Sequence, residues 1–179
     1  MLKKILLGCC LVLIAFIVIV ALQPAEYRVV RSATVSAPAS TVFGQVNDFH
    51  NWEAWSPWAK RDPAAKNSFE GPSAGTGAVF KWAGNKEVGE GRMTITESRP
   101  SDLIRIKLEF IKPFASTAST EFAFKSEGNQ TTVTWSMAGQ KNFVSKAFCL
   151  FMNMDKMVGG DFEKGLASLK GVSQASATK

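Results

Sequence analysis

The sequence predicts an α+β fold in which a curved antiparallel sheet of about seven strands is covered by one long C-terminal helix, behind an N-terminal transmembrane helix. Three observations predict it. Ile5–Leu22 is an uninterrupted run of 18 apolar or small residues. Across Ser68–Met137, apolar and polar side chains alternate in short segments, which is typical of strands with one buried face. Across Val144–Leu169, apolar residues recur every three or four positions, as in one helical stripe.

The N-terminal run favours a membrane anchor. As a helix it spans about 27 Å, close to the thickness of a bilayer core. It is long for a signal peptide, and no Ala-x-Ala cleavage site follows it. A cleaved signal sequence is the alternative. The segment Leu6–Cys9 resembles a lipobox, but most of the apolar run follows the cysteine, so we do not expect lipidation.

The orientation of the anchor is inferred from the flanking charges. Lys3 and Lys4 precede the run and favour a cytoplasmic N-terminus, with the rest of the chain on the other side of the membrane. Arg28 and Arg31, beyond the run, oppose this orientation.

The charge distribution does not indicate a nucleic-acid partner. The net charge is +6, and the basic residues are dispersed, with no basic helix face. Cys9 and Cys10 lie in the apolar run, so Cys149 is the only cysteine of the soluble part. An intradomain disulfide and a cysteine-based metal site are therefore excluded, and no metal or cofactor is expected.

The chain divides into an anchor and linker over 1–25, a globular domain over 26–171, and a small polar tail over 172–179 that we expect to be flexible. The domain begins with a strand over Tyr27–Val35. Gly159-Gly160 interrupts the long terminal helical pattern, since glycine is unfavourable inside a helix, and predicts a kink or two abutting helices there.

The segment Asp48–Trp58 contains three of the five tryptophans, between the first short helix and the strands. With Gly160–Lys170 at the end of the chain, this order resembles the START/Bet v 1-like superfamily, and more narrowly its bacterial polyketide cyclase/dehydrase-like (SRPBCC) branch. The resemblance covers about Tyr27–Gly171. It implies a helix-grip fold, in which a curved sheet wraps the terminal helix around an apolar cavity.

The resemblance makes the large apolar side chains candidates for ligand binding. The tryptophans would form a rim, the strand aromatics the sheet side, and the terminal helix the other wall. Whether Val79 or Phe80 faces inward depends on the register. For any single residue, a place in the core is the favoured interpretation, and the case for a cavity is collective. The candidates are Trp52, Trp55, Trp58, Phe80, Trp82, Phe110, Phe122, Phe124, Trp135, Phe148, Phe151 and Met152.

Catalytic groups are scarce. His50 is the only histidine; it could act as a general base, but a hydrogen bond within the tryptophan segment or exposure to water is the favoured interpretation. No partner for it is visible in the sequence, and no catalytic residue is assigned. Charged residues on the strands are expected to form pairs on the outer face rather than a buried headgroup site: Glu90, Arg92, Arg105 and Glu109.

Three functions remain. The favoured one is a membrane-anchored binding protein for a small hydrophobic ligand, such as a lipid, quinone or polyketide-like compound. An enzyme, a cyclase or hydrolase of polyketide type, would need His50 or an inward carboxylate beside the cavity. A stress-response or protein-interaction module is the third. With the resemblance to bacterial proteins, the anchor implies a single-pass protein of the bacterial inner membrane with a periplasmic domain.

Overall fold

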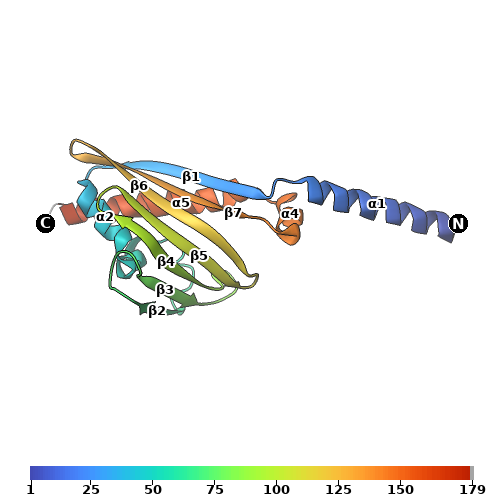
Figure 1. Ribbon diagram of the computed structural model, residues 1–179, viewed down its shortest axis with the longest axis horizontal. Coiled ribbons are helices and arrows are strands. Elements are labelled where there is room, and N and C mark those ends of the chain that lie inside the picture. The colour runs from blue at the N-terminus through green and yellow to red at the C-terminus, as the bar shows by residue number, and fades with distance from the viewer. Residues whose placement is uncertain (178–179) are drawn as a thin grey trace.

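The computed structural model describes residues 1–177 and consists of one helix projecting from an α+β domain (Figure 1). The helix α1 (Leu2–Leu22) is joined by three residues to a sheet that curves around a long last helix, α5 (Met154–Ala177). The other elements are β1 (Glu26–Val35), α2 (Ala39–Asn47), η1 (Phe49–Asn51), α3 (Trp52–Trp55), β2 (Lys66–Glu70), β3 (Val79–Ala83), β4 (Glu90–Arg99), β5 (Leu103–Lys112), β6 (Ser116–Glu127), β7 (Gln130–Gln140) and α4 (Phe143–Cys149).

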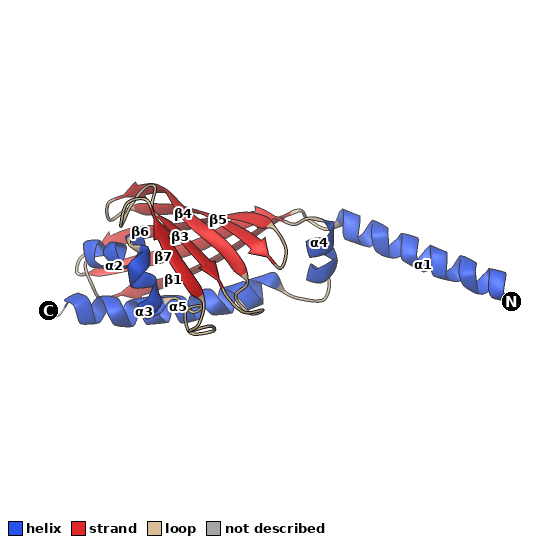
Figure 2. Ribbon diagram, turned by 90° about the horizontal axis from the view of Figure 1, so that it is seen from below, coloured by secondary structure: helices blue, strands red, loops and turns tan. Residues whose placement is uncertain are grey.

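The sheet has seven antiparallel strands in the order β1-β7-β6-β5-β4-β3-β2. From β2 to β7 it is a meander, because each strand pairs with its neighbour in sequence. The first strand, β1, pairs with the last, β7, with Glu26 opposite Gln140 and Val35 opposite Thr131. Figure 2 shows α5 along the open side of this curved sheet, with α2 and α3 beside it. The predicted helix-grip fold is confirmed.

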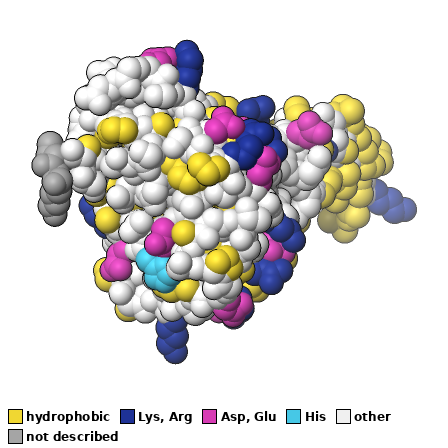
Figure 3. Space-filling view, turned by 60° about the vertical axis from the view of Figure 1, so that its left-hand side comes forward, with side chains coloured by type: hydrophobic (Ala, Val, Ile, Leu, Met, Phe, Trp, Pro, Cys, Tyr) yellow, Lys and Arg dark blue, Asp and Glu magenta, His cyan; other side chains and the backbone are white. Residues whose placement is uncertain are grey.

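The helix α1 is the one element, within residues 1–177, that is long and apolar enough to cross a membrane, with a mean hydropathy of 3.4. A signal sequence would have the same character. The part of α1 that is visible in Figure 3 presents mostly apolar side chains. Its last turn touches the domain: Val20 is fully buried, and the ammonium of Lys146 on α4 donates a hydrogen bond to the carbonyl of Ala21 at 3.2 Å.

The C-terminal helical pattern is broken at a different place from the one predicted. The break lies at residues 150–153, between α4 and α5, while Gly159-Gly160 lies inside α5. An asparagine caps the start of each of the two helices, and the second, Asn153, lies at the break. The side chain of Asn142 accepts a hydrogen bond from the backbone N–H of Ser145 at 2.8 Å, and that of Asn153 accepts one from Lys156 at 3.0 Å. Each satisfies free N–H groups in a first helical turn and so starts a separate helix.

The last helix is also longer than predicted. It continues past Gly171 to Ala177, where a flexible tail was expected, and Ser173 is fully buried. Packing against the domain outweighs the small polar composition of this segment. Residues 178–179 lie outside the described part of the chain.

An aromatic stack fills the middle of the domain. The ring of Phe162 on α5 lies on Trp135 of β7, with centroids 4.0 Å apart and planes 7° apart. Trp135 lies in turn on Phe122 of β6 at 4.7 Å. Trp55 meets Trp135 edge-on at 5.8 Å, and Trp52 meets Phe122 edge-on at 5.9 Å. These aromatic contacts join the last helix, the sheet and the tryptophan segment into one core.

The close approach of α5 to Trp135 depends on Gly165. A Cβ atom at this position would lie 2.7 Å from Cζ3 of Trp135 and 3.1 Å from Cδ of Pro57. Real Cβ contacts are longer, so a larger residue would push the helix off the stack.

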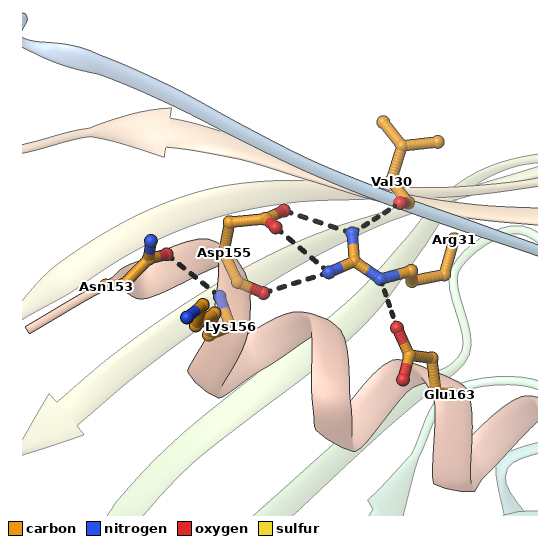
Figure 4. Close-up of polar contacts among 6 residues, drawn as sticks. All are labelled: Val30, Arg31, Asn153, Asp155, Lys156 and Glu163. Carbon is orange, nitrogen blue, oxygen red and sulfur yellow. Dashed lines mark hydrogen bonds and ion pairs between the residues drawn. The ribbon is translucent and has the colours of Figure 1, made fainter.

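Arg31 holds the first half of α5 to β1 (Figure 4). Its two terminal nitrogens donate to both carboxylate oxygens of Asp155 at 3.0 Å, and its Nε donates to Glu163 at 2.6 Å. Gly159 leaves the space, because a Cβ there would lie 2.0 Å from the guanidinium. The hydrogen bonds from Arg31 lower the pKa of the Asp155 carboxyl. Arg61 forms a further ion pair with α5, to Asp161 at 2.5 Å.

Gly165→Ala should destabilise the domain, by about 1–3 kcal/mol, because the new methyl group collides with Trp135. Gly160→Ala is the matched control, since nothing lies within 4 Å of a Cβ at that position of the same helix. It should stabilise by up to about 1 kcal/mol through helix propensity. Thermal unfolding followed by circular dichroism measures both. Equal effects of the two substitutions would contradict the packing described.

The contact between Arg31 and Asp155 should make stability depend on pH. Because folding lowers the pKa of Asp155, the contact stabilises the fold above the unfolded pKa, about 3.9, and this contribution is lost as the pH falls through the lower folded value. Asp155→Asn should therefore lower the unfolding temperature at pH 6 more than at pH 3. In an Arg31→Gln background the same substitution should have little effect. A pH-independent loss in both backgrounds would rule out the proposed electrostatic cause.

Candidate functional site

One group of predicted site residues lies in the core. Trp52, Trp55, Phe122, Phe124 and Trp135 are buried, with Trp55 only 1% exposed. The indole N–H groups of Trp52 and Trp55 donate to the carbonyls of Val46 and Gln45 at 2.9 and 3.0 Å, which fixes both rings against α2. These residues occupy the space in which the sequence predicted a cavity. Trp58 is half-buried at their edge, 5.8 Å from the ring of Trp135.

A second group lies on the concave face of the sheet and is incompletely covered. Phe80, Trp82, Leu108 and Phe110 all project from β3 and β5 toward the inside of the grip, and each is half-buried. The reason is the position of α5, which packs chiefly on β1, α2 and α3. We call these four residues the open strip. Phe80, rather than Val79, faces the inside.

Ring contacts hold the open strip together. Phe80 stacks on Trp82 at 6.0 Å, and Trp82 meets Phe110 edge-on at 6.2 Å. The indole N–H of Trp82 donates to the carbonyl of Val88 at 2.9 Å. Gly91 makes room for this indole, because a Cβ there would lie 2.4 Å from it. The strip therefore presents apolar carbon, with its one indole N–H already bonded within the domain.

The third group lies away from the open strip. Phe148, Phe151 and Met152 are 54%, 80% and 39% exposed, on α4 and the turn after it. The sequence placed Phe148 and Phe151 on the same stripe as Phe162, and all three residues on the helix side opposite the sheet. Because Asn153 starts a new helix, α4 is separated from α5 and lies beside α1 instead.

Polar groups on the outer face form surface pairs, as expected. Arg92 donates to Glu109 at 2.7 Å, and Lys112 pairs with Glu90. Hydrogen bonds from Arg92 and then Lys107 lower the pKa of Glu109 to about 2. An open depression of about 570 Å³ lies over this face, and a shallower one of about 260 Å³ lies beside it. The larger is bordered by outward side chains together with Trp82 and Phe110 of the open strip, and the smaller mainly by outward side chains. Both are open to solvent, so neither is the predicted interior cavity.

His50 makes the hydrogen bond within the tryptophan segment that the sequence favoured; its partner, which the sequence did not identify, is Asp48. Its Nδ1 lies 2.7 Å from a carboxylate oxygen of Asp48, which also accepts the backbone N–H of His50 at 2.9 Å. The signal was present, because an aspartate two residues before a histidine can cap the intervening turn. The imidazole stacks on Phe69 at 4.0 Å, and Phe69 contacts Phe80 at 5.4 Å. The pair therefore stands at one end of a row of rings that leads into the open strip.

Two further polar groups on the inner side were not predicted. Arg31 lies between Val29 and Ala33 of β1, at a position where strand alternation would place an inward apolar side chain. Its ion pairs with carboxylates on α5 explain why an arginine is found there. The indole N–H of Trp135 is buried without a hydrogen-bond partner among the described residues. Neither lies on the open strip.

Comparisons with known proteins agree with the geometry. The chain from residue 26 to 174 matches the family described as polyketide cyclase / dehydrase and lipid transport. A search of curated proteins finds no match.

Solved structures share the fold at low identity. A protein from Nitrosospira multiformis is 17% identical, with a TM-score of 0.60, over 86% of this chain and 100% of the other. The Aha1 dimer from Colwellia psychrerythraea is 14% identical, with a TM-score of 0.57, over 80% and 93%. The di-domain ARO/CYC protein StfQ from the steffimycin biosynthetic pathway is 11% identical, with a TM-score of 0.61, over 87% and 53%. With its helix-grip domain matched from the first strand into the last helix, this chain belongs to the polyketide cyclase / dehydrase and lipid transport family.

Proposed function

We propose that the protein is a membrane-anchored binding protein for a small hydrophobic ligand. One observation carries the proposal: the open strip presents four large apolar side chains on the concave face, where folded domains normally cover such groups. A ligand that lies on the strip would complete this cover. Membership of a family described by lipid transport and polyketide cyclisation supports a hydrophobic ligand of this kind.

The chemistry of the strip favours an elongated apolar molecule, such as a lipid chain, a quinone tail or a polyketide-like compound. Rings follow one another from Phe69 through Phe80 and Trp82 to Phe110. Such a row offers dispersion contacts along its whole length and few hydrogen-bonding groups, so it would bind by burial of apolar area. The tight core beside it, built on the aromatic stack, supports the strip as the proposed binding surface.

The anchor completes the proposal. In this account α1 is a single membrane span of a bacterial inner membrane, with Lys3 and Lys4 on the cytoplasmic side and the domain in the periplasm. A tether of this kind would keep a ligand-binding domain at the surface of the membrane that dissolves its ligand.

An enzyme of cyclase or hydrolase type is the second candidate, and the Asp48–His50 pair favours it. A carboxylate that accepts from Nδ1 leaves Nε2 of a neutral imidazole able to take a proton. The pair would act on a polar group at the Phe69 end of the ring row. Turnover of a bound polyketide-like substrate that is unchanged by His50→Ala would remove this candidate, and binding should survive that substitution.

Phe110→Ala should weaken ligand binding about tenfold or more, because it removes apolar contact area from the strip. Ile111→Ala is the control: this neighbour is 55% exposed and borders the larger depression together with Phe110, but it is not one of the four residues of the open strip. The measurement is mass spectrometry of small apolar molecules that co-purify with the full chain, followed by titration of the identified class. Absence of any such molecule, together with no binding of fatty acids or quinones, would defeat the proposal. So would loss of binding in Ile111→Ala alone.

A further inference from the structure

Exposed apolar side chains gather at the end of the domain next to α1. Val144, Phe148 and Phe151 follow one another at helical spacing, and all three are exposed. With Met152 they form what we call the α4 stripe. The turn between β5 and β6 adds Phe114, which is 72% exposed, at the same end of the sheet (Figure 1).

The connection to α1 fixes this end of the domain in space. Residues 23–25 join α1 to β1, and three residues span at most about 10 Å. Glu26 pairs with Gln140 at the end of β7, and the N–H of Lys141 donates to the carbonyl of Ala25 at 2.7 Å. Because α4 begins two residues later, it lies level with the linker. Lys146 of α4 also bonds the last turn of α1 directly.

The charges around the stripe are complementary to an anionic lipid surface. Between residues 141 and 157 the chain has three lysines, Lys141, Lys146 and Lys156, and one carboxylate, Asp155. The charge of that carboxylate is already paired with Arg31. Exposed aromatic and aliphatic side chains with lysines beside them are typical of a helix that lies in the plane of a membrane interface.

We infer that the α4 stripe and Phe114 insert into the lipid interface, so that the open strip ends at the membrane. This inference rests on the proposed membrane anchor. Phe110 stands two residues before the end of β5, next to the turn that carries Phe114. A hydrophobic ligand can then pass between the bilayer and the strip without crossing water. The occupant of the stripe is the lipid surface rather than a protein.

The test uses the full chain in nanodiscs of phosphatidylcholine and phosphatidylglycerol that contain nitroxide-labelled lipids. The three natural cysteines are replaced by alanine, and an environment-sensitive NBD label is attached to one new cysteine at a time. Phe151→Cys reports on the stripe, with Phe148→Cys as a second site in case one variant folds poorly. Ile14→Cys reports on the anchor. Ser119→Cys, on the exposed outer face of β6, is the control in water.

We expect lipid nitroxides to quench the label at 151 or 148 to within about twofold of the label at 14, and at least about fivefold more than the label at 119. Strong quenching at 14 with none at 151 and 148 would leave the anchor intact and overturn this inference. A label at 151 that is shielded from water but not quenched by lipid would indicate a protein partner, and it would also overturn it. A label at 14 that stays in water would defeat the proposed anchor itself.

Discussion

The contact between Phe162 and Trp135 is the interaction on which the rest of the domain depends. It sets the distance of α5 from the sheet, and it is possible because Gly165 presents no side chain to the indole. Phe122 continues the stack on the sheet side, and Trp52 and Trp55 close it from the tryptophan segment. A helix held this closely over β7 and β1 lies too far to one side to cover β3 and β5. The dense core and the open strip therefore have the same cause.

Ion pairs also hold α5 in its position over β7 and β1. Arg31 reaches it from β1, and Arg61 reaches it from the loop after the tryptophan segment. Both engage carboxylates on the first half of α5: Asp155 lies near its start, and Asp161 and Glu163 lie on either side of Phe162. Paired ions of this kind contribute little net stability at an exposed surface, but bidentate geometry such as that of Arg31 and Asp155 specifies orientation. The helix is thus positioned by packing through Phe162 and by ion pairs at its start and on either side of that residue.

Much of the fold could be predicted from the sequence because its signals are local. Alternation along β4 to β7, and the apolar run of α1, each report on one element at a time. The break between α4 and α5 was also local, since Asn142 and Asn153 both cap helices, but the apolar period runs across it. The same period joined Phe148 and Phe151 to Phe162, and so placed them inside the domain. Their exposure follows from the break.

The candidate site was less predictable, because core and binding surface use the same residue types. Trp135 and Trp82 look alike in the sequence, each in an alternating strand, yet one is stacked under α5 and the other is half-exposed. The difference comes from the position of the helix, which depends on contacts distant in sequence such as Gly165 with Trp135. The roles of Arg31 and of the Asp48–His50 pair also depend on the groups around them in space. Sequence hints existed, because Arg31 interrupts the inward apolar positions of β1 and Asp48 lies two residues before His50.

In the proposed function, a hydrophobic ligand lies on the open strip beside an intact core. Photo-crosslinking tests it most directly: the full chain in native membranes is exposed to a diazirine fatty acid, irradiated and digested, and the modified residues are identified by mass spectrometry. We expect adducts on Trp82 and Phe110. Adducts on Phe122, Trp135 or Phe162, which would require the stack to open, or no adduct within the domain, would contradict it.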